Sequence, residues 1–170
     1  MTERQPYTVV EKCIGYEIRD YPELRLAQVD LRASFSSAGN MAFGPLINYI
    51  SGGNASSQRI AMTAPVLQEA TAKDTYLVSF VMPAGMSEGA LPRPIDGRVS
   101  VVSVPARRVA AVGFRGGWNE QRFHEQETAL RSALVRDQRT FSGEPTYARF
   151  DPPWKPGFLK YSEVLVDLNN

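Results

Sequence analysis

The amino-acid sequence predicts an α+β fold in which one strand-helix-strand-strand unit occurs twice. Apolar residues alternate along short segments in both halves of the chain, as they do in strands with one buried face. Each half also has one segment whose apolar residues recur at helical spacing. Because one helix cannot cover the sheet of its own half, we expect the halves to form one curved, barrel-like sheet with both helices packed across it. The 170 residues suit a single domain.

A comparison of the two halves with each other supports the repeat. When the chain is shifted by 83 residues, residues 22–32 align with residues 105–115, and five of the eleven aligned pairs are identical. Phe35 then aligns with Trp118, and each of these aromatic residues stands just before a helical segment. We therefore predict an internal duplication with pseudo-repeats at about 14–83 and 98–168.

The first half contains a helix between two groups of strands. We expect short strands at residues 7–11, 15–20 and 24–31, and the hydroxyls of residues 34–37 offer an N-cap for the helix that follows. Pro45 lies inside that helix and predicts a kink or a later start, because proline removes a donor and clashes with the preceding turn. The pair Gly52–Gly53 predicts the helix end. Strands are expected at residues 59–68 and 75–82.

The second half repeats this order after a loop at residues 83–97, which is rich in glycine and proline. We expect strands from residue 99 and at 108–114, a helix at 119–136, and strands near 145–150 and 161–168. The loop contains Gly-Met-Ser-Glu-Gly at 85–89, which matches G-x-S-x-G. A nucleophile elbow needs a strand before it and a helix directly after it. Since Pro92 and Pro94 occupy that position, we predict no catalytic residue here.

Composition excludes several classes of protein. A formal net charge of +1 gives no attraction for a polyanion, which argues against nucleic acid as the main partner. A single cysteine, Cys13, allows no internal disulfide. The first residues hold no apolar signal segment, and no apolar run approaches the roughly 20 residues of a membrane helix. We expect a soluble, cytoplasmic protein, and no set of residues demands an enzyme.

The stretch around the end of the first helix resembles a known family. Residues 49–54 (Tyr-Ile-Ser-Gly-Gly-Asn) and 60–66 (Ile-Ala-Met-Thr-Ala-Pro-Val) are similar to the SOUL family of haem-binding proteins, and residues 16–21, 79–83 and 151–156 agree in the same order. The resemblance implies one SOUL-type domain over residues 1–170, built as a distorted antiparallel β-barrel flanked by two helices. It also extends to the effector-binding domains of bacterial drug-responsive regulators.

For function, the resemblance implies that haem or a related tetrapyrrole binds in a partly exposed apolar cleft, for buffering or transport. The residues that could form the cleft are Met41, Leu46, Tyr49, Ile50 and Met62, where methionine's flexible thioether adapts to a flat ring. Arg59 and Lys155 are candidate partners for the two propionates. Each of these residues has an ordinary alternative, as part of the core for the apolar ones and as a solvated charge for the cations.

His124 is the only histidine and therefore the candidate axial ligand of haem iron. Its alternative is a boundary position on an amphipathic helix, with Glu120 one turn away for an ion pair.

Glu163 and Trp154 suggest a second function, an effector-binding-like domain that binds or hydrolyses small amphipathic molecules. A carboxylate directed into a cleft would favour cations; otherwise Glu163 pairs with an arginine such as Arg25 or Arg108. A protein-interaction role is a third hypothesis, although the second helix carries no partner motif.

Overall fold

The computed structural model describes residues 2–169, and within them nine strands form one antiparallel sheet. The order across the sheet is β2-β3-β9-β11-β10-β6-β7-β4-β8. The strands are β2 (Thr8–Cys13), β3 (Tyr16–Tyr21), β4 (Leu24–Arg32), β6 (Val66–Ala72), β7 (Thr75–Val81), β8 (Val99–Val104), β9 (Arg107–Arg115), β10 (Phe141–Arg149) and β11 (Tyr161–Leu168). A separate parallel pair joins β1 (Glu3–Arg4) to β5 (Thr63–Ala64).

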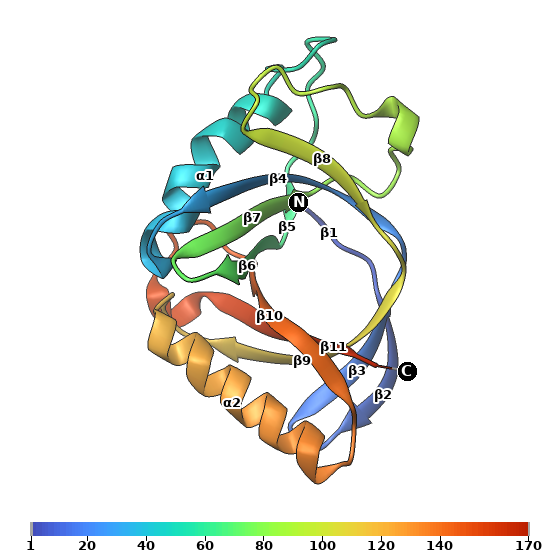
Figure 1. Cartoon of the computed structure of the whole chain (residues 1–170), viewed down its shortest axis with the longest axis vertical. Coiled ribbons are helices and arrows are strands. Elements are labelled where there is room, and N and C mark those ends of the chain that lie inside the picture. Colours follow the sequence, from blue (N-terminus) through green and yellow to red (C-terminus); the bar gives the residue numbers. More distant parts are fainter. Residues whose placement is uncertain (1, 170) are drawn as a thin grey trace.

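The sheet curls strongly without closing, and both helices pack on its outer side (Figure 1). The two edge strands, β2 and β8, each pair with one neighbour only. Helix α1 (Phe35–Ile50) packs on β4, β7 and β8, whereas α2 (Glu120–Arg136) packs on β9, β10 and β11. The expected α+β fold with two helices on a barrel-like sheet is therefore confirmed, in the form of an open, curled sheet.

The strand order has an internal symmetry. Exchanging β3 with β8, β4 with β9, β6 with β10 and β7 with β11 reverses the order of these eight strands and leaves every pairing intact. Strand β4 and strand β9 are also offset by the same 83 residues that align the two sequence segments. A duplicated unit would produce this arrangement, and the duplication itself stays a prediction.

Both helices begin at the residues that the sequence indicates. The Ser34 side chain accepts a hydrogen bond from the backbone nitrogen of Ser37, and Asn119 caps α2 in the same way. The expected later start at Pro45 is wrong, because α1 runs unbroken from Phe35 through the proline. Pro45 lies on the buried side of the helix, where packing against the sheet offsets the lost backbone hydrogen bond. Gly52 has a φ of 114°, which fits the predicted helix end.

The strand expected at residues 59–68 is wrong in its bounds. Residues 60–62 lie outside the strands, and the extended segment is divided into β5 and β6 at Pro65. Proline has no backbone N–H to give to a ladder, which explains the interruption. The loop at 83–97 is as expected, apart from a short 3₁₀ turn (Glu88–Ala90), and no α-helix follows its G-x-S-x-G sequence.

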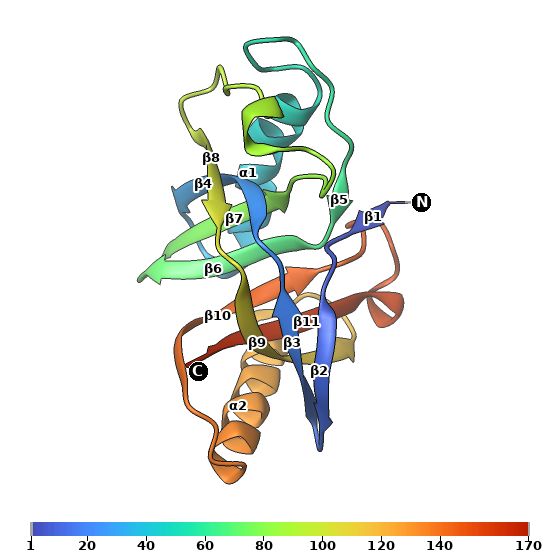
Figure 2. The same cartoon turned by 90° about the vertical axis from the view of Figure 1, so that its right-hand side faces the viewer.

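The core divides between the two sides of the sheet. Under α1 it contains Ala27, Leu46 and Phe80, and under α2 it contains Phe123 and Val164. The inner, concave side is covered less completely, by two small clusters at its two ends. In Figure 2 the paired strands β1 and β5 lie next to each other at one margin of the curled sheet. Among the described residues, no helix has the length and apolar character needed to cross a membrane.

Candidate functional site

An apolar cavity, which we call the helix cleft, lies beside α1. Its volume is about 540 Å³. Its walls come from α1, from the end of β10 and the chain that follows it, from residues 62–66, and from Trp118 and Lys160. The lining residues include Phe35, Phe43, Ile47, Met62, Val66, Trp118, Arg149, Phe150, Pro152, Pro153 and Lys160.

Arg149 brings a positive charge into this apolar lining. Its guanidinium lies over the rings of Phe35, Trp118 and Phe123, at 5.3 to 5.5 Å from their centroids. One nitrogen donates a 2.6 Å hydrogen bond to Gln68, while Nε is buried and has no acceptor within the described residues. Burial lowers the pKa of Arg149 to about 10. The side chain is thus a cation without a carboxylate partner in the part of the chain that the structure describes.

Lys160 supplies a second cation to the helix cleft. Its Nζ lies 3.8 Å from the centroid of the Trp118 ring, which is a cation–π contact. It forms no ion pair with any other described residue. Two positive groups therefore lie against Trp118 in a largely apolar cavity, whose lining also includes the Asp151 carboxylate.

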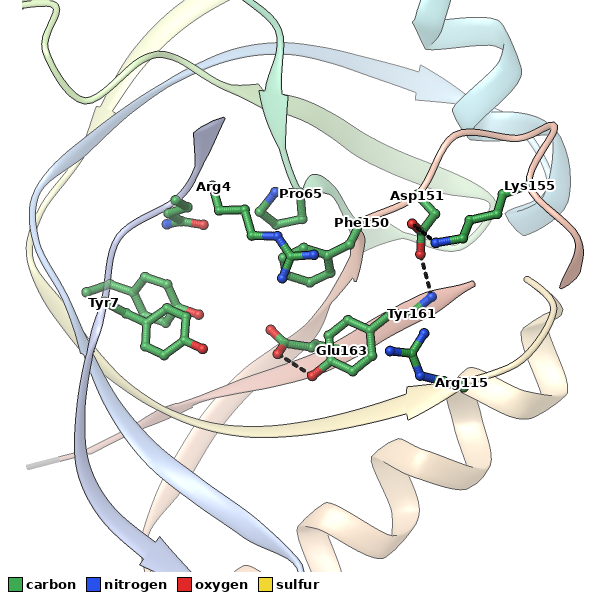
Figure 3. Close-up of a pocket in the computed structure, with 11 residues that line it drawn as sticks. Arg4, Tyr7, Pro65, Arg115, Phe150, Asp151, Lys155, Tyr161 and Glu163 are labelled. Atoms are coloured by element: carbon green, nitrogen blue, oxygen red, sulfur yellow. Dashed lines mark hydrogen bonds and ion pairs between the residues drawn. The ribbon is translucent and has the colours of Figure 1, made fainter. Parts of the chain in front are cut away.

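A second cavity, which we call the sheet pocket, lies on the concave side of the curled sheet (Figure 3). Its volume is about 270 Å³, and polar groups dominate its lining. It is separate from the helix cleft, although Phe150 and Asp151 line both. The lining residues are Arg4, Gln5, Tyr7, Tyr21, Pro65, Arg115, Phe150, Asp151, Lys155, Tyr161 and Glu163.

A buried ion pair forms the floor of the sheet pocket. Both terminal nitrogens of Arg19 on β3 donate 2.7 Å hydrogen bonds to the Glu163 carboxylate on β11, and the Tyr161 hydroxyl donates another at 2.8 Å. Arg19 is 4% exposed and Glu163 is 3% exposed. Burial opposes the charge of Arg19, but the hydrogen bonds and charge of Glu163 raise its pKa. Glu163 is therefore held as a fully paired carboxylate.

The wall of the sheet pocket depends on a close contact between neighbouring strands. Gly113 on β9 pairs with Glu163, and a Cβ at Gly113 would overlap the Tyr161 ring and hydroxyl. Nearby, Asp151 accepts a 2.8 Å hydrogen bond from Lys155 and a 2.6 Å bond from the backbone nitrogen of Tyr161. Although its burial opposes ionisation, these hydrogen bonds lower the pKa of Asp151.

The predicted cleft residues of α1 lie mostly in the core. Leu46, Tyr49 and Ile50 are at most 6% exposed and pack between α1 and the sheet, so they do not line the helix cleft. Met41 points outward and is 55% exposed. The helix turns different side chains to the cleft, among them Phe43 and Ile47.

The remaining predicted residues are divided among three places. Met62 lines the helix cleft, whereas Lys155 lines the sheet pocket and Arg59 is exposed. Trp154 is 84% exposed and lines neither cavity. Glu163 does face a cavity, but its partner is Arg19 and not Arg25 or Arg108, which pair with Glu23 and Asp20.

His124 lies on the outer surface of α2. Its two ring nitrogens are 3.5 Å from Glu120 and 3.4 Å from Glu127, and its side chain is 57% exposed. It lines neither the helix cleft nor the sheet pocket. Within residues 2–169, no three His, Cys, Asp or Glu side chains gather as metal ligands would.

Sequence reasoning missed Arg149 and Lys160, the two cations of the helix cleft. Both residues flank the proline-rich segment 151–156, which carries the family resemblance. Their position beside that segment is the signal in the sequence that could have identified them. Trp118 was noted only as the counterpart of Phe35, and these two aromatic residues both line the helix cleft.

Comparisons with known proteins agree with this geometry at the level of the fold and the family. The C-terminal domain of EcmrR superposes with a TM-score of 0.70 at 12% identity, over 96% of this chain and 98% of that domain. A hydrolase from Listeria innocua superposes with a TM-score of 0.62 at 10% identity, over 91% of both chains. At such low identity these likenesses concern the fold alone.

The sequence comparisons are more specific. Human heme-binding protein 2 is 28% identical over 149 residues, which cover 83% of this chain and 72% of that protein. The model of the SOUL heme-binding protein family matches residues 2–167, which is nearly the whole chain. The protein therefore belongs to the SOUL heme-binding protein family.

Proposed function

We propose that the protein binds haem or a related tetrapyrrole in the helix cleft and serves to buffer or transport it. The observation that carries this proposal is an apolar cavity of about 540 Å³ with two cations, Arg149 and Lys160, in its lining. The family and the human relative, a heme-binding protein by name, support the same ligand class.

The size and walls of the helix cleft suit a flat apolar ring. Ligand cavities typically measure about 300–1,000 Å³ and are lined mainly by apolar and aromatic side chains. Phe43 and Ile47 from α1 face this cavity, as do Met62 and the ring of Phe150. The flexible thioether of Met62 can adapt to either face of a macrocycle.

The two cations suit the propionates of haem. A cation that is partly buried without a carboxylate gains more from an anionic ligand than a solvated cation does, because its desolvation has already occurred. Arg149 meets this description, since its Nε lacks an acceptor within the described residues and burial lowers its pKa. Lys160 lies against the same Trp118 ring.

Iron ligation is the part of the proposal in which this chain differs from a histidine-ligated haem protein. No histidine or cysteine is among the described residues that line the helix cleft. His124 is on the outer surface of α2, where its ring nitrogens lie 3.5 Å from Glu120 and 3.4 Å from Glu127. We propose that apolar contacts and propionate pairing carry most of the affinity, which favours a reversible carrier.

A haemin titration of the purified protein, followed in the Soret band, tests this function. We expect a saturable one-to-one shift that is unchanged in His124→Ala. Arg149→Met removes the cation and keeps the bulk of the side chain, so it should weaken haemin binding by about tenfold. The matched control is Arg98→Met, which removes an arginine whose side chain is 69% exposed and does not line the cleft.

Three outcomes would contradict the proposal. Absence of a saturable shift at micromolar haemin would exclude haem as the ligand. Loss of the shift in His124→Ala would move the site to α2. Equal weakening by Arg149→Met and Arg98→Met would show a nonspecific charge effect. Metal-free protoporphyrin IX, followed by fluorescence, should bind with similar affinity, since the cleft contacts the ring and the propionates.

A further inference from the structure

The sheet pocket is not used by the proposed haem function, yet it is a built cavity with its own chemistry. Figure 3 shows the side chains of Arg4, Phe150, Glu163 and Tyr161 together in the lining of this pocket. Its volume of about 270 Å³ is too small for a tetrapyrrole and near the lower end of the range for small ligands. A ligand that fits this pocket would be a small molecule.

The carboxylate of Glu163 is not available to a cationic ligand. Arg19 neutralises it through two 2.7 Å hydrogen bonds, and the Tyr161 hydroxyl takes a further acceptor site. Arg19 also donates from Nε to Glu17 at 2.7 Å. A cation that entered the pocket would have to displace Arg19 or the Tyr161 hydroxyl from Glu163 before it could bind that carboxylate.

Most of the remaining polar groups of the pocket are hydrogen-bond donors, and several of them have no carboxylate partner. Arg115 donates to the backbone oxygen of Leu159 at 3.0 Å, and the one further carboxylate of the lining, Asp151, is held by Lys155 at 2.8 Å. Gln5 is 6% exposed, and its side-chain amide nitrogen is buried with no partner within the described residues. Arg4 and Arg115 form no ion pair in that part of the chain. Tyr21, which is 3% exposed, accepts a 2.9 Å hydrogen bond from Arg19, so its own proton remains to be donated. An unpaired buried donor is costly, which makes an acceptor the complementary ligand.

The walls of the pocket add an aromatic component. The rings of Tyr7 and Tyr21 lie 5.3 Å apart between centroids. Phe150 and Tyr161 lie 5.4 Å apart on the other side, and Arg4 lies over the Phe150 ring at 5.0 Å. An aromatic ring can pack against such walls, with its charged end toward the arginines.

We propose that the sheet pocket binds a small aromatic carboxylate. Arg4, Arg115 and the Gln5 amide would hold the carboxylate, while the tyrosine and phenylalanine rings would enclose the aromatic body. The site is distinct from the helix cleft and its function does not depend on haem.

Isothermal titration calorimetry with three probes of similar size tests which ligand charge the sheet pocket prefers. Benzoate, benzyl alcohol and benzylamine carry a negative, a neutral and a positive group on the same ring. We expect saturable one-to-one binding of benzoate, with benzyl alcohol and benzylamine at least tenfold weaker. Tighter binding of benzylamine than of benzoate would overturn the proposal, and so would an absence of benzoate binding at millimolar concentration.

Variants locate the site. Arg4→Met and Arg115→Met should each weaken the binding of benzoate by about tenfold, because each removes a charged hydrogen bond to its carboxylate. Gln5→Leu should also weaken it, whereas Arg98→Met, the distant control, should not. A benzoate affinity that is unchanged in both Arg4→Met and Arg115→Met would refute the assignment.

A cross-comparison separates this proposal from the haem function. Arg149→Met should weaken the binding of haemin and leave the binding of benzoate unchanged. Gln5→Leu should weaken the binding of benzoate and leave that of haemin unchanged. If haemin displaces benzoate and Arg4→Met weakens both ligands equally, the pocket is an extension of the haem site and the separate carboxylate site is refuted.

Discussion

The Arg19–Glu163 pair offers a direct test of how the concave side of the sheet is stabilised. The two side chains come from β3 and β11, which lie on either side of β9, and both are nearly inaccessible to solvent. Replacing Arg19 with methionine keeps much of the bulk and removes both 2.7 Å hydrogen bonds to Glu163. The carboxylate would then remain buried with only the Tyr161 hydroxyl as a described donor.

The magnitude follows from that loss. Removing one partner of a buried ion pair typically costs about 3–5 kcal/mol, because an uncompensated charge stays in the interior. Removing both partners leaves no buried charge. The free energy of unfolding of the double variant, Arg19→Met with Glu163→Met, should therefore lie within about 1.5 kcal/mol of that of the parent protein. The double variant should thus be markedly more stable than Arg19→Met alone.

Urea unfolding at neutral pH, followed by tryptophan fluorescence, measures these differences. The slope of the unfolding free energy against urea should be the same in all variants, so that shifts of the midpoint report stability. A double variant that loses as much as the two single variants added together would refute the reasoning, since the two groups would then be independent. Arg98→Met serves as the surface control.

Two further predictions concern the same region. Gly113→Ala should destabilise the fold by about 1–3 kcal/mol by displacing Tyr161, whereas Gly117→Ala, with no atom within 4 Å of the new Cβ, should not; equal urea midpoints for the two would contradict this. Burial raises the pKa of Tyr21 from 10.0 to about 12, so the unfolded state loses this proton first and stability should fall as pH rises from 10 to 12. The free energy of unfolding of Tyr21→Phe should fall less over that range, by up to about 2.7 kcal/mol. If urea unfolding shows the same loss of stability with pH in the parent protein and in Tyr21→Phe, Tyr21 is not the group responsible.

Much of the fold could be predicted because its signals are local. The caps at Ser34 and Asn119, the end of α1 near Gly52 and the bounds of α2 all follow from side chains within a few residues of the feature. The course of α1 through Pro45 could not be predicted in this way. It depends on a buried face, and so on contacts with strands that lie far away in the sequence.

The candidate site was harder to predict for the same reason. The sequence singles out Met62 and Glu163, and the structure places each of them in the lining of a cavity, but the sequence could not supply Arg19 as the partner of Glu163. That pairing requires β3 and β11 to flank β9, which is a property of the whole sheet. Likewise, helical spacing identifies a buried stripe on α1 and cannot tell whether Leu46 or Ile47 faces a ligand.

The strand order, which stays the same when the two halves of the sheet are exchanged, has a consequence for the two ends of the concave side. Its two ends are equivalent in topology but differ in content, since one concave end is filled by an aliphatic cluster that includes Leu24, Leu67 and Val81, and the other holds the Arg19–Glu163 network. The same strand arrangement is therefore completed by two different kinds of contact, apolar packing at one end and a buried ion pair at the other. The topology fixes where these side chains lie and leaves their chemistry open, so the two ends of one sheet can suit different ligands.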